Sequence, residues 1–331
     1  MVDPRYPPTA PLPGEQALTS LGLDLTQPRP ATSEQRFPDG GAFRLEIPSV
    51  EGMGPLSAVV AEAERLGVTL HRVSQGSGVM MLSDGEIDDM VGLCQERHLE
   101  LSLFLGPRGT WDIGGAVRAP AGGGGPRARG RDQLGQAVAE SARAAEHGVP
   151  CVLVADEGVL WCLHRLRAKG DLPPDLSLKV SALAGPSNPA SFLVLEGLGA
   201  DSINIPSDLT VAQVAELRAA GSAAIDFYLE APEDLGGFVR PYDAPELVRV
   251  GAPIYLKFGL RNHPPLYPVG GHLRAMATEL ARERVRRAAL CLELLERAGL
   301  ADLASPPGSR AMPAAVRFPV PAAGPEPVPT R

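Results

Sequence analysis

This chain of 331 residues has only three lysines, and two of them lie at positions where they could take part in catalysis. Lys179 and Lys257 each lie in a short run of alternating apolar and polar residues, a pattern that predicts a β-strand. A lysine in such a run points to the face opposite the apolar residues. If that face lines the interior of a barrel, the ammonium group needs a carboxylate partner or a chemical role.

Other ionisable residues fall at equivalent positions of further expected strands. The alternation directs Glu46, Arg72, Asn204, Tyr228 and Glu230 to the same interior face. Barrel interiors are ordinarily filled by Val, Ile and Leu, so polar residues there indicate a ligand site or a network of ion pairs. The two readings stay open for any single residue, and the size of the set favours the ligand site.

The carboxylates and lysines of this set predict acid–base or metal-assisted chemistry. We expect four of them to be catalytic: Glu46, Lys179, Glu230 and Lys257. Carboxylate oxygens are also the ligands that Mg²⁺ and Mn²⁺ prefer, and the candidates for a metal site are Glu46, Asp156, Glu157 and Glu230.

Further residues are expected to bind a small, polar, anionic substrate. Arg72, Arg108 and Arg240 would hold its anionic end, because guanidinium groups match carboxylate and phosphate geometry. Asn204 and Tyr228 would add hydrogen bonds. A glycine pair at positions 236 and 237 precedes Arg240 and could let backbone N–H groups approach an anion.

The elements that would position these residues alternate between strand and helix. Eight strands are expected near residues 43–50, 69–74, 100–105, 151–156, 177–182, 202–205, 224–230 and 253–258. Helical runs lie between most of them, and several end in glycine before the next strand. Eight such units in about 260 residues predict a (β/α)8 TIM barrel. An open doubly wound sheet is disfavoured, because residues 49–54 do not match its glycine-rich loop.

The rest of the chain is expected to be less ordered. Residues 1–40 and 304–331 are rich in proline and poor in apolar periodicity, so we expect disordered tails around a barrel domain of residues 41–303. Residues 117–131 contain four consecutive glycines followed by three arginines. This insertion is either a flexible lid over an anionic substrate or a solvated loop.

Composition excludes several classes of function. A net charge of −8 argues against binding nucleic acid, which requires clustered positive charge. There is no apolar run long enough to span a membrane and no signal pattern, so we expect a cytoplasmic protein. The four cysteines are far apart, and no nucleotide-binding motif is present. We therefore expect neither an iron–sulfur cluster nor a nucleotide cofactor.

Several short motifs together resemble a known family. They run from 44-RLEIP-48 and 71-HRV-73 through 106-GPR-108, 156-DEG-158 and 179-KVS-181 to 199-GADS-202 and 236-GGFVR-240. The order is similar to actinobacterial TIM-barrel proteins of the U32 peptidase family, which implies a barrel over residues 43–300. The cysteine signature of that family is missing here, so the resemblance implies neither its peptidase activity nor its cluster.

These observations leave three hypotheses. The first is a metabolic enzyme, of lyase, isomerase or amide hydrolase type, acting on a small anionic molecule. The second is Schiff-base chemistry at Lys179 or Lys257, which requires a neutral amine. The third is a barrel that binds a ligand without catalysis. The long amphipathic run 273–298 would cover the barrel or contact a second copy of the chain.

Overall fold

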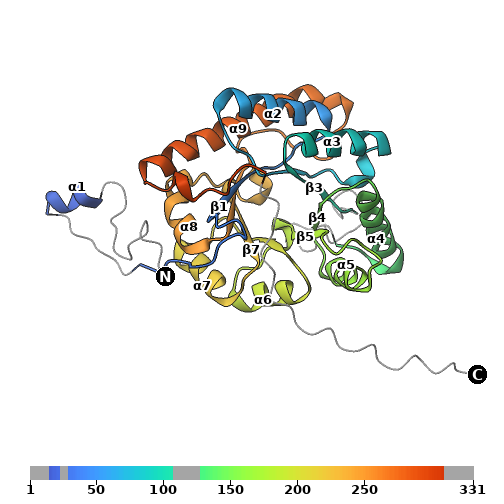
Figure 1. Cartoon of the computed structure of the whole chain (residues 1–331), viewed down its shortest axis with the longest axis horizontal. Coiled ribbons are helices and arrows are strands. Elements are labelled where there is room, and N and C mark those ends of the chain that lie inside the picture. Colours follow the sequence, from blue (N-terminus) through green and yellow to red (C-terminus); the bar gives the residue numbers. More distant parts are fainter. Residues whose placement is uncertain (1–14, 23–28, 107–126, 309–331) are drawn as a thin grey trace, which may run out of the picture.

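The computed structural model of the chain describes residues 15–22, 29–106 and 127–308. Within them, eight parallel strands close into a barrel in sequence order, and β8 pairs with β1. Figure 1 shows the strands at the centre and the helices around them. The strands are β1 (Phe43–Ile47), β2 (Arg72–Gln75), β3 (Glu100–Phe104), β4 (Cys151–Val154), β5 (Ser177–Val180), β6 (Ser202–Asn204), β7 (Ala224–Glu230) and β8 (Ile254–Phe258).

The expected TIM barrel is thus confirmed, with each strand within a few residues of its predicted bounds. The helices are α1 (Glu15–Ser20), α2 (Met53–Leu66), α3 (Asp84–Glu96), α4 (Gly130–Glu146), α5 (Glu157–Lys169), α6 (Pro189–Gly197), α7 (Val211–Ala220), α8 (Ala244–Gly251) and α9 (Arg274–Arg297). The last of these, α9, packs along α2 and against β1 and β8 (Figure 1). None of the helices in the described ranges combines the length and apolarity that crossing a bilayer requires.

Local sequence explains where these helices begin and end. Ser83 and Thr210 each form a capping box with the residue three positions later, which satisfies two backbone N–H groups at the start of α3 and α7. Gly67, in the left-handed conformation with φ 66°, ends α2 as expected. Gly221 was expected to act in the same way, but its φ of −130° is extended. A Cβ there would lie 2.7 Å from the ring of Phe192, so close packing requires this glycine.

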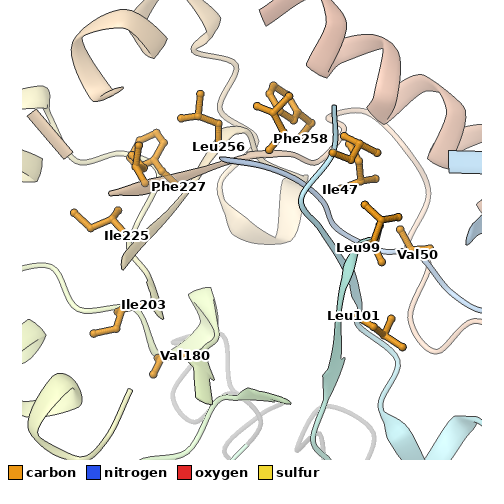
Figure 2. Close-up of a cluster of buried hydrophobic side chains, with 14 of the residues drawn as sticks. Ile47, Val50, Leu99, Leu101, Val180, Ile203, Ile225, Phe227, Leu256 and Phe258 are labelled. Atoms are coloured by element: carbon orange, nitrogen blue, oxygen red, sulfur yellow. The ribbon is translucent and has the colours of Figure 1, made fainter. Parts of the chain in front are cut away.

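An apolar layer lies between the strands and the helices. Figure 2 shows part of it, including Val180, Ile203, Ile225 and Leu256, all buried. These aliphatic residues alternate with the polar residues of the same strands, as the period of a strand requires. The opposite faces of the strands therefore fill the barrel interior with polar side chains. The four cysteines belong to buried or half-buried positions and are free thiols.

Residues 29–40 and the segment around Ser305 cover the end of the barrel at which the strands begin. Phe37 is 2 % exposed, and its ring lies 5.3 Å from that of Tyr255 and 4.0 Å from the guanidinium carbon of Arg44. The backbone of Ser305 donates to the carbonyl of Phe43 at 3.0 Å. Residues 29–40 are therefore packed against the barrel, which corrects the expectation that the first 40 residues form a disordered tail. Most of the expected insertion, residues 117–126, lies outside the described residues.

Candidate active site

Glu46 is the central carboxylate of the barrel interior. It lies on β1, is fully buried, and accepts a hydrogen bond from the hydroxyl of Ser74. Its Oε2 pairs with Lys179 and lies 3.3 Å from Nη1 of Arg72, while its Oε1 lies 3.3 Å from Nζ of Lys257. Burial alone would raise the pKa of Glu46, but these three positive charges outweigh burial and hold it well below its usual value.

Arg72 links Glu46 to two further carboxylates. Its Nη1 lies 2.9 Å from Oδ1 of Asp226, and its Nε lies 3.0 Å from Oε2 of Glu100. The guanidinium carbon of Arg72 stacks 3.6 Å from the ring centre of Tyr255, whose hydroxyl donates to Glu100 at 3.1 Å. Glu46, Glu100 and Asp226 therefore balance Arg72, Lys179 and Lys257, and the interior carries little net charge.

Burial shifts the pKa values of Lys179 and Asp226 in opposite directions. Burial lowers the pKa of Lys179 to about 8, although Asp226 and Glu46 act in the opposite direction. Burial raises the pKa of Asp226 from its ordinary value, and Lys179 and Arg72 offset this only in part. Nζ of Lys179 lies 3.6 Å from Oδ1 of Asp226, and Oδ2 of Asp226 has no hydrogen-bond partner in the described part of the chain. Burial thus disfavours the charged form of both groups, whose side chains lie next to each other in the barrel interior.

Lys257 lies on the side of the network that faces the carboxyl ends of the strands. Its Nζ donates to Oδ1 of Asn204 at 2.5 Å and lies 4.2 Å from the ring centre of Tyr228. The amide of Asn204 in turn donates to the carbonyl of Val180 at 2.6 Å, which fixes the orientation of its oxygen. Tyr228 is half-buried, and Lys257 is 2 % exposed. The carboxyl ends of the strands are where TIM barrels form active sites.

The structure brings together most of the interior residues that the sequence predicted. The residues that meet are Glu46, Arg72, Lys179, Asn204, Tyr228 and Lys257. Glu100, Asp226, Ser74 and Tyr255 belong to the same network but were not predicted as site residues. Asp226 carried a usable signal, because it alternates with the apolar residues of β7 in the same way as Tyr228.

Glu230 was predicted to be catalytic, but it has other partners. The pairing of β7 with β8 shifts register between Tyr228 and Glu230, so the alternation that directs side chains inward stops there. Oε1 of Glu230 accepts the backbone N–H of Arg261 at 3.0 Å, and Oε2 lies 3.2 Å from Nε of Arg287 on α9. Glu230 therefore joins the β8–α9 connection to the rim of the barrel.

Arg240 was predicted to bind substrate and instead connects two loops. It donates to the carbonyls of Ser207 at 2.6 Å and Leu209 at 2.7 Å, and it pairs with Asp243 at 2.7 Å. Its guanidinium is thus occupied by the protein. Arg108, the other predicted anion-binding arginine of a loop, lies outside the described residues.

The four predicted metal ligands do not meet. Asp156 accepts the N–H groups of Val159 at 2.9 Å and Ala128 at 3.2 Å, which makes it the N-cap of α5. Glu157 is half-buried and pairs with Arg127. Glu46 is enclosed by cations, and Glu230 faces α9. No group of three or more His, Cys, Asp or Glu side chains in the described ranges is arranged to hold a metal ion.

Comparisons with known proteins found no family for this chain and only distant structural likenesses. No family model matches the chain, and no curated protein matches it. Similar solved structures include the U32 peptidase Mk0906, at 18 % identity and a TM-score of 0.43, covering 68 % of this chain and 96 % of that one. The YdjI aldolase from Escherichia coli K12 has 15 % identity and a TM-score of 0.48, with coverage of 78 % and 93 %. A putative fructose-1,6-biphosphate aldolase from Coccidioides immitis has 10 % identity and a TM-score of 0.49, with coverage of 79 % and 92 %. At these values the likeness assigns neither a family nor an activity to the chain.

Proposed function

We propose that this chain is an enzyme that transfers a proton at a carbon next to a carbonyl group in a small anionic compound, as lyases and isomerases do. One observation carries the proposal. Charged side chains from six strands meet inside the barrel, and the ammonium group of Lys257 lies on the side where the strands end, held by Asn204 and Glu46. Active sites of this fold form at that end.

In the proposed reaction, Lys257 is the catalytic residue. In the proposed step, water at the mouth of the barrel takes the proton from this carbon, and the electron pair of the broken C–H bond passes to the carbonyl oxygen, which becomes negatively charged. A fixed ammonium group stabilises that oxyanion strongly, because it is already oriented and its surroundings are largely dry. Asn204 and Tyr228 hold Lys257 in place through the hydrogen bond and the ring contact described above.

Glu46, Lys179 and Asp226 are positioning residues in this proposal. Glu46 contacts both lysines and thereby couples them electrostatically. The pKa of Lys179, lowered by burial to about 8, and the raised pKa of Asp226 both move toward neutral pH. Groups with pKa values near the working pH give up and accept protons most effectively. Lys179, with its pKa of about 8, is therefore suited to buffer the charge of Lys257 during turnover.

Hydrogen exchange tests this proposal without knowledge of the substrate. In D₂O, the wild-type chain should exchange the hydrogen next to the carbonyl group in members of a panel of 2-oxo acids and phosphorylated ketones, followed by NMR. Lys257→Met should abolish the exchange. Lys169→Met is the matched control, since Lys169 is 74 % exposed on its side chain and pairs with Asp171 at the surface. Full exchange by Lys257→Met, or none by the wild-type chain across the panel, would reduce the network to a structural role.

Schiff-base chemistry is the second candidate, and the lowered pKa of Lys179 favours it specifically. A neutral lysine attacks the carbonyl carbon, water leaves, and an iminium ion forms. Borohydride then adds hydride to the iminium carbon and leaves a stable secondary amine. Because the chain has three lysines, peptide mass mapping after borohydride treatment with the same panel would assign the adduct directly. Modification of Lys169 alone, or of no lysine, would reject this candidate.

A further inference from the structure

Arg284 is a buried cation with few partners. It lies on α9 and is 1 % exposed. Its Nη1 donates to the carbonyl oxygen of Ser49, just beyond the end of β1, at 3.4 Å. In residues 15–22, 29–106 and 127–308, no other hydrogen bond to its guanidinium is formed, and the buried Nε is without a partner. No ion pair formed within these ranges includes Arg284.

Other buried arginines in the same structure have more partners than Arg284. Arg44 pairs with Asp39 at 2.6 Å, and Arg72 has the two carboxylates described above. Among the described residues, no carboxylate lies within salt-bridge distance of Arg218, and its buried Nε also lacks a partner, but both of its terminal nitrogens donate to carbonyl oxygens, those of Ala223 and Gly221. A buried charge without a partner is costly, so a protein that keeps one generally uses it.

The two carboxylates that act on Arg284 electrostatically, Glu51 and Glu230, already have other hydrogen-bond or ion-pair partners. Glu51 accepts the backbone N–H groups of Gly76 at 2.6 Å and Ser77 at 3.1 Å. Glu230 accepts the N–H of Arg261 and pairs with Arg287. Burial lowers the pKa of Arg284, and Tyr267, Glu51, Tyr228 and Glu230 oppose this from a distance. Among the described residues, the positive charge of Arg284 is therefore opposed only from a distance, and no carboxylate at the carboxyl end of the barrel contacts it directly.

The surroundings of Arg284 connect it with Lys257. Tyr228 acts on Arg284 electrostatically, and its ring also lies 4.2 Å from the ammonium group of Lys257. Tyr267 also acts on Arg284 electrostatically, and its hydroxyl bonds that of Ser49, whose carbonyl oxygen accepts from Arg284. Both tyrosines are half-buried. A small molecule with an anionic group at Arg284 would thus have its remaining atoms close to the proposed catalytic lysine.

We propose that Arg284 binds an oxyanion, the carboxylate or phosphate group of the substrate, between the end of β1 and the β8–α9 connection. The guanidinium group offers Nε and Nη2, which form one edge of its planar fork and can donate two parallel hydrogen bonds to a single oxyanion. This inference rests on the proposed function and deepens it, because it assigns the residue that holds the anionic end of the substrate.

Thermal unfolding of the full chain in added anion tests this role. Inorganic phosphate and sodium acetate are the probes, and sodium chloride at equal ionic strength is the reference. In the wild-type chain, one or both probes should raise Tm saturably above chloride, since a ligand that binds the folded state alone stabilises it. A response to phosphate identifies a phosphorylated substrate, and a response to acetate a carboxylate.

Arg284→Met should weaken the apparent affinity for the probe by roughly tenfold or more, the usual cost of losing charge-assisted hydrogen bonds. Without added anion, its Tm should equal or exceed that of the wild-type chain, because a buried unpaired charge has been removed. Arg286→Gln is the matched control: Arg286 lies on the same helix, is 52 % exposed on its side chain and pairs with Glu283 at the surface. Its anion response should match that of the wild-type chain.

Several results would overturn the role of Arg284. One is a wild-type chain that responds to neither probe beyond chloride, and another is an unchanged response in Arg284→Met. If the methionine variant does not fold, Arg284→Lys keeps the charge without the planar fork, and an undiminished response in it also refutes the proposal. If the wild-type chain catalyses deuterium exchange but does not respond to either anion, only the role of Arg284 is rejected. If the wild-type chain responds to an anion but catalyses no deuterium exchange, only the proton-transfer proposal is rejected.

Discussion

Replacing Glu46 by glutamine tests whether the interior of the barrel is one coupled network. The change keeps the shape of the side chain and removes its charge. Lys179, Lys257 and Arg72 then face one carboxylate fewer, and Asp226, already sharing its Oδ1 with Arg72 and Lys179, cannot replace the lost contacts. Breaking a fully buried ion pair from one side typically costs about 3–5 kcal/mol.

This cost can be expressed as a change in melting temperature. For a domain of this size, 1 kcal/mol corresponds to about 2–4 °C in Tm, so Glu46→Gln should lower Tm by roughly 6–20 °C. Urea unfolding followed by circular dichroism should show a lower midpoint with an unchanged slope, because the surface exposed on unfolding is the same. The loss should also shrink in the double variant Glu46→Gln/Lys179→Met, which removes one of the unpaired cations.

A surface pair provides the control for Glu46→Gln. Glu64 pairs with Arg97, and their side chains are 59 % and 44 % exposed. Such pairs contribute about 0–1 kcal/mol, so Glu64→Gln should leave the urea midpoint nearly unchanged. Two results would show that the residues are not coupled as the distances indicate. One is a loss of less than about 1 kcal/mol in unfolding free energy for Glu46→Gln. The other is a double variant whose loss equals the sum of the losses of Glu46→Gln and Lys179→Met.

Three further outcomes are expected. Burial lowers the folded-state pKa of His71 from 6.5 to about 4, so the unfolded chain binds more protons than the folded chain between these pH values. The free energy of unfolding should therefore fall by roughly 3 kcal/mol as the pH drops from 6.5 to about 4. In a plot of the urea midpoint against pH, His71→Gln should reduce the slope in this range. The pKa of Lys179 is about 8 in the folded chain and 10.5 in the unfolded chain. The free energy of unfolding should therefore rise by roughly 3 kcal/mol as the pH increases between these values, and urea midpoints of Lys179→Met measured over the same range should not show this rise. A Cβ on Gly41 would lie 2.7 Å from the backbone of Ser305, so Gly41→Ala should lower the free energy of unfolding in urea by about 1–3 kcal/mol. Gly85 in α3 is the control: a Cβ there meets nothing within 4 Å, so Gly85→Ala should not lower this free energy. Equal losses for the two alanine variants, or pH profiles identical to wild type for the other two, would contradict these expectations.

The barrel could be predicted from the sequence because most of its strands alternate between apolar and polar residues. In β8, Ile254 and Leu256 face the helices, and Tyr255 and Lys257 face the interior, as a period of two requires. The same rule placed Glu46 and Lys179 correctly. Glycine spacing after helices then defined the order of the units, so the closed barrel followed from local patterns alone.

The parts of the site that were missed depend on breaks in that alternation. Glu230 lies beyond the register shift of β7, which no periodicity argument can locate. Asp156 lies two residues past the end of β4, and its role as the N-cap of α5 is typical of an aspartate just before a helix. The packing of residues 29–40 depends on one aromatic residue, Phe37, and on scattered polar contacts such as the pair of Asp39 with Arg44, and neither produces a periodic signal.

The closure of the barrel floor has a consequence for synthesis of the protein on the ribosome. Phe43 of the first strand is bridged to Ala304, and the backbone N–H of Ala42 donates to the carbonyl of Leu303 at 2.7 Å. Nε2 of His71 lies 2.9 Å from the carbonyl of Ser305. A nascent chain that has emerged only as far as β8 can close the ring of strands but leaves these groups exposed to water. The finished floor therefore forms only after nearly 50 more residues have left the exit tunnel.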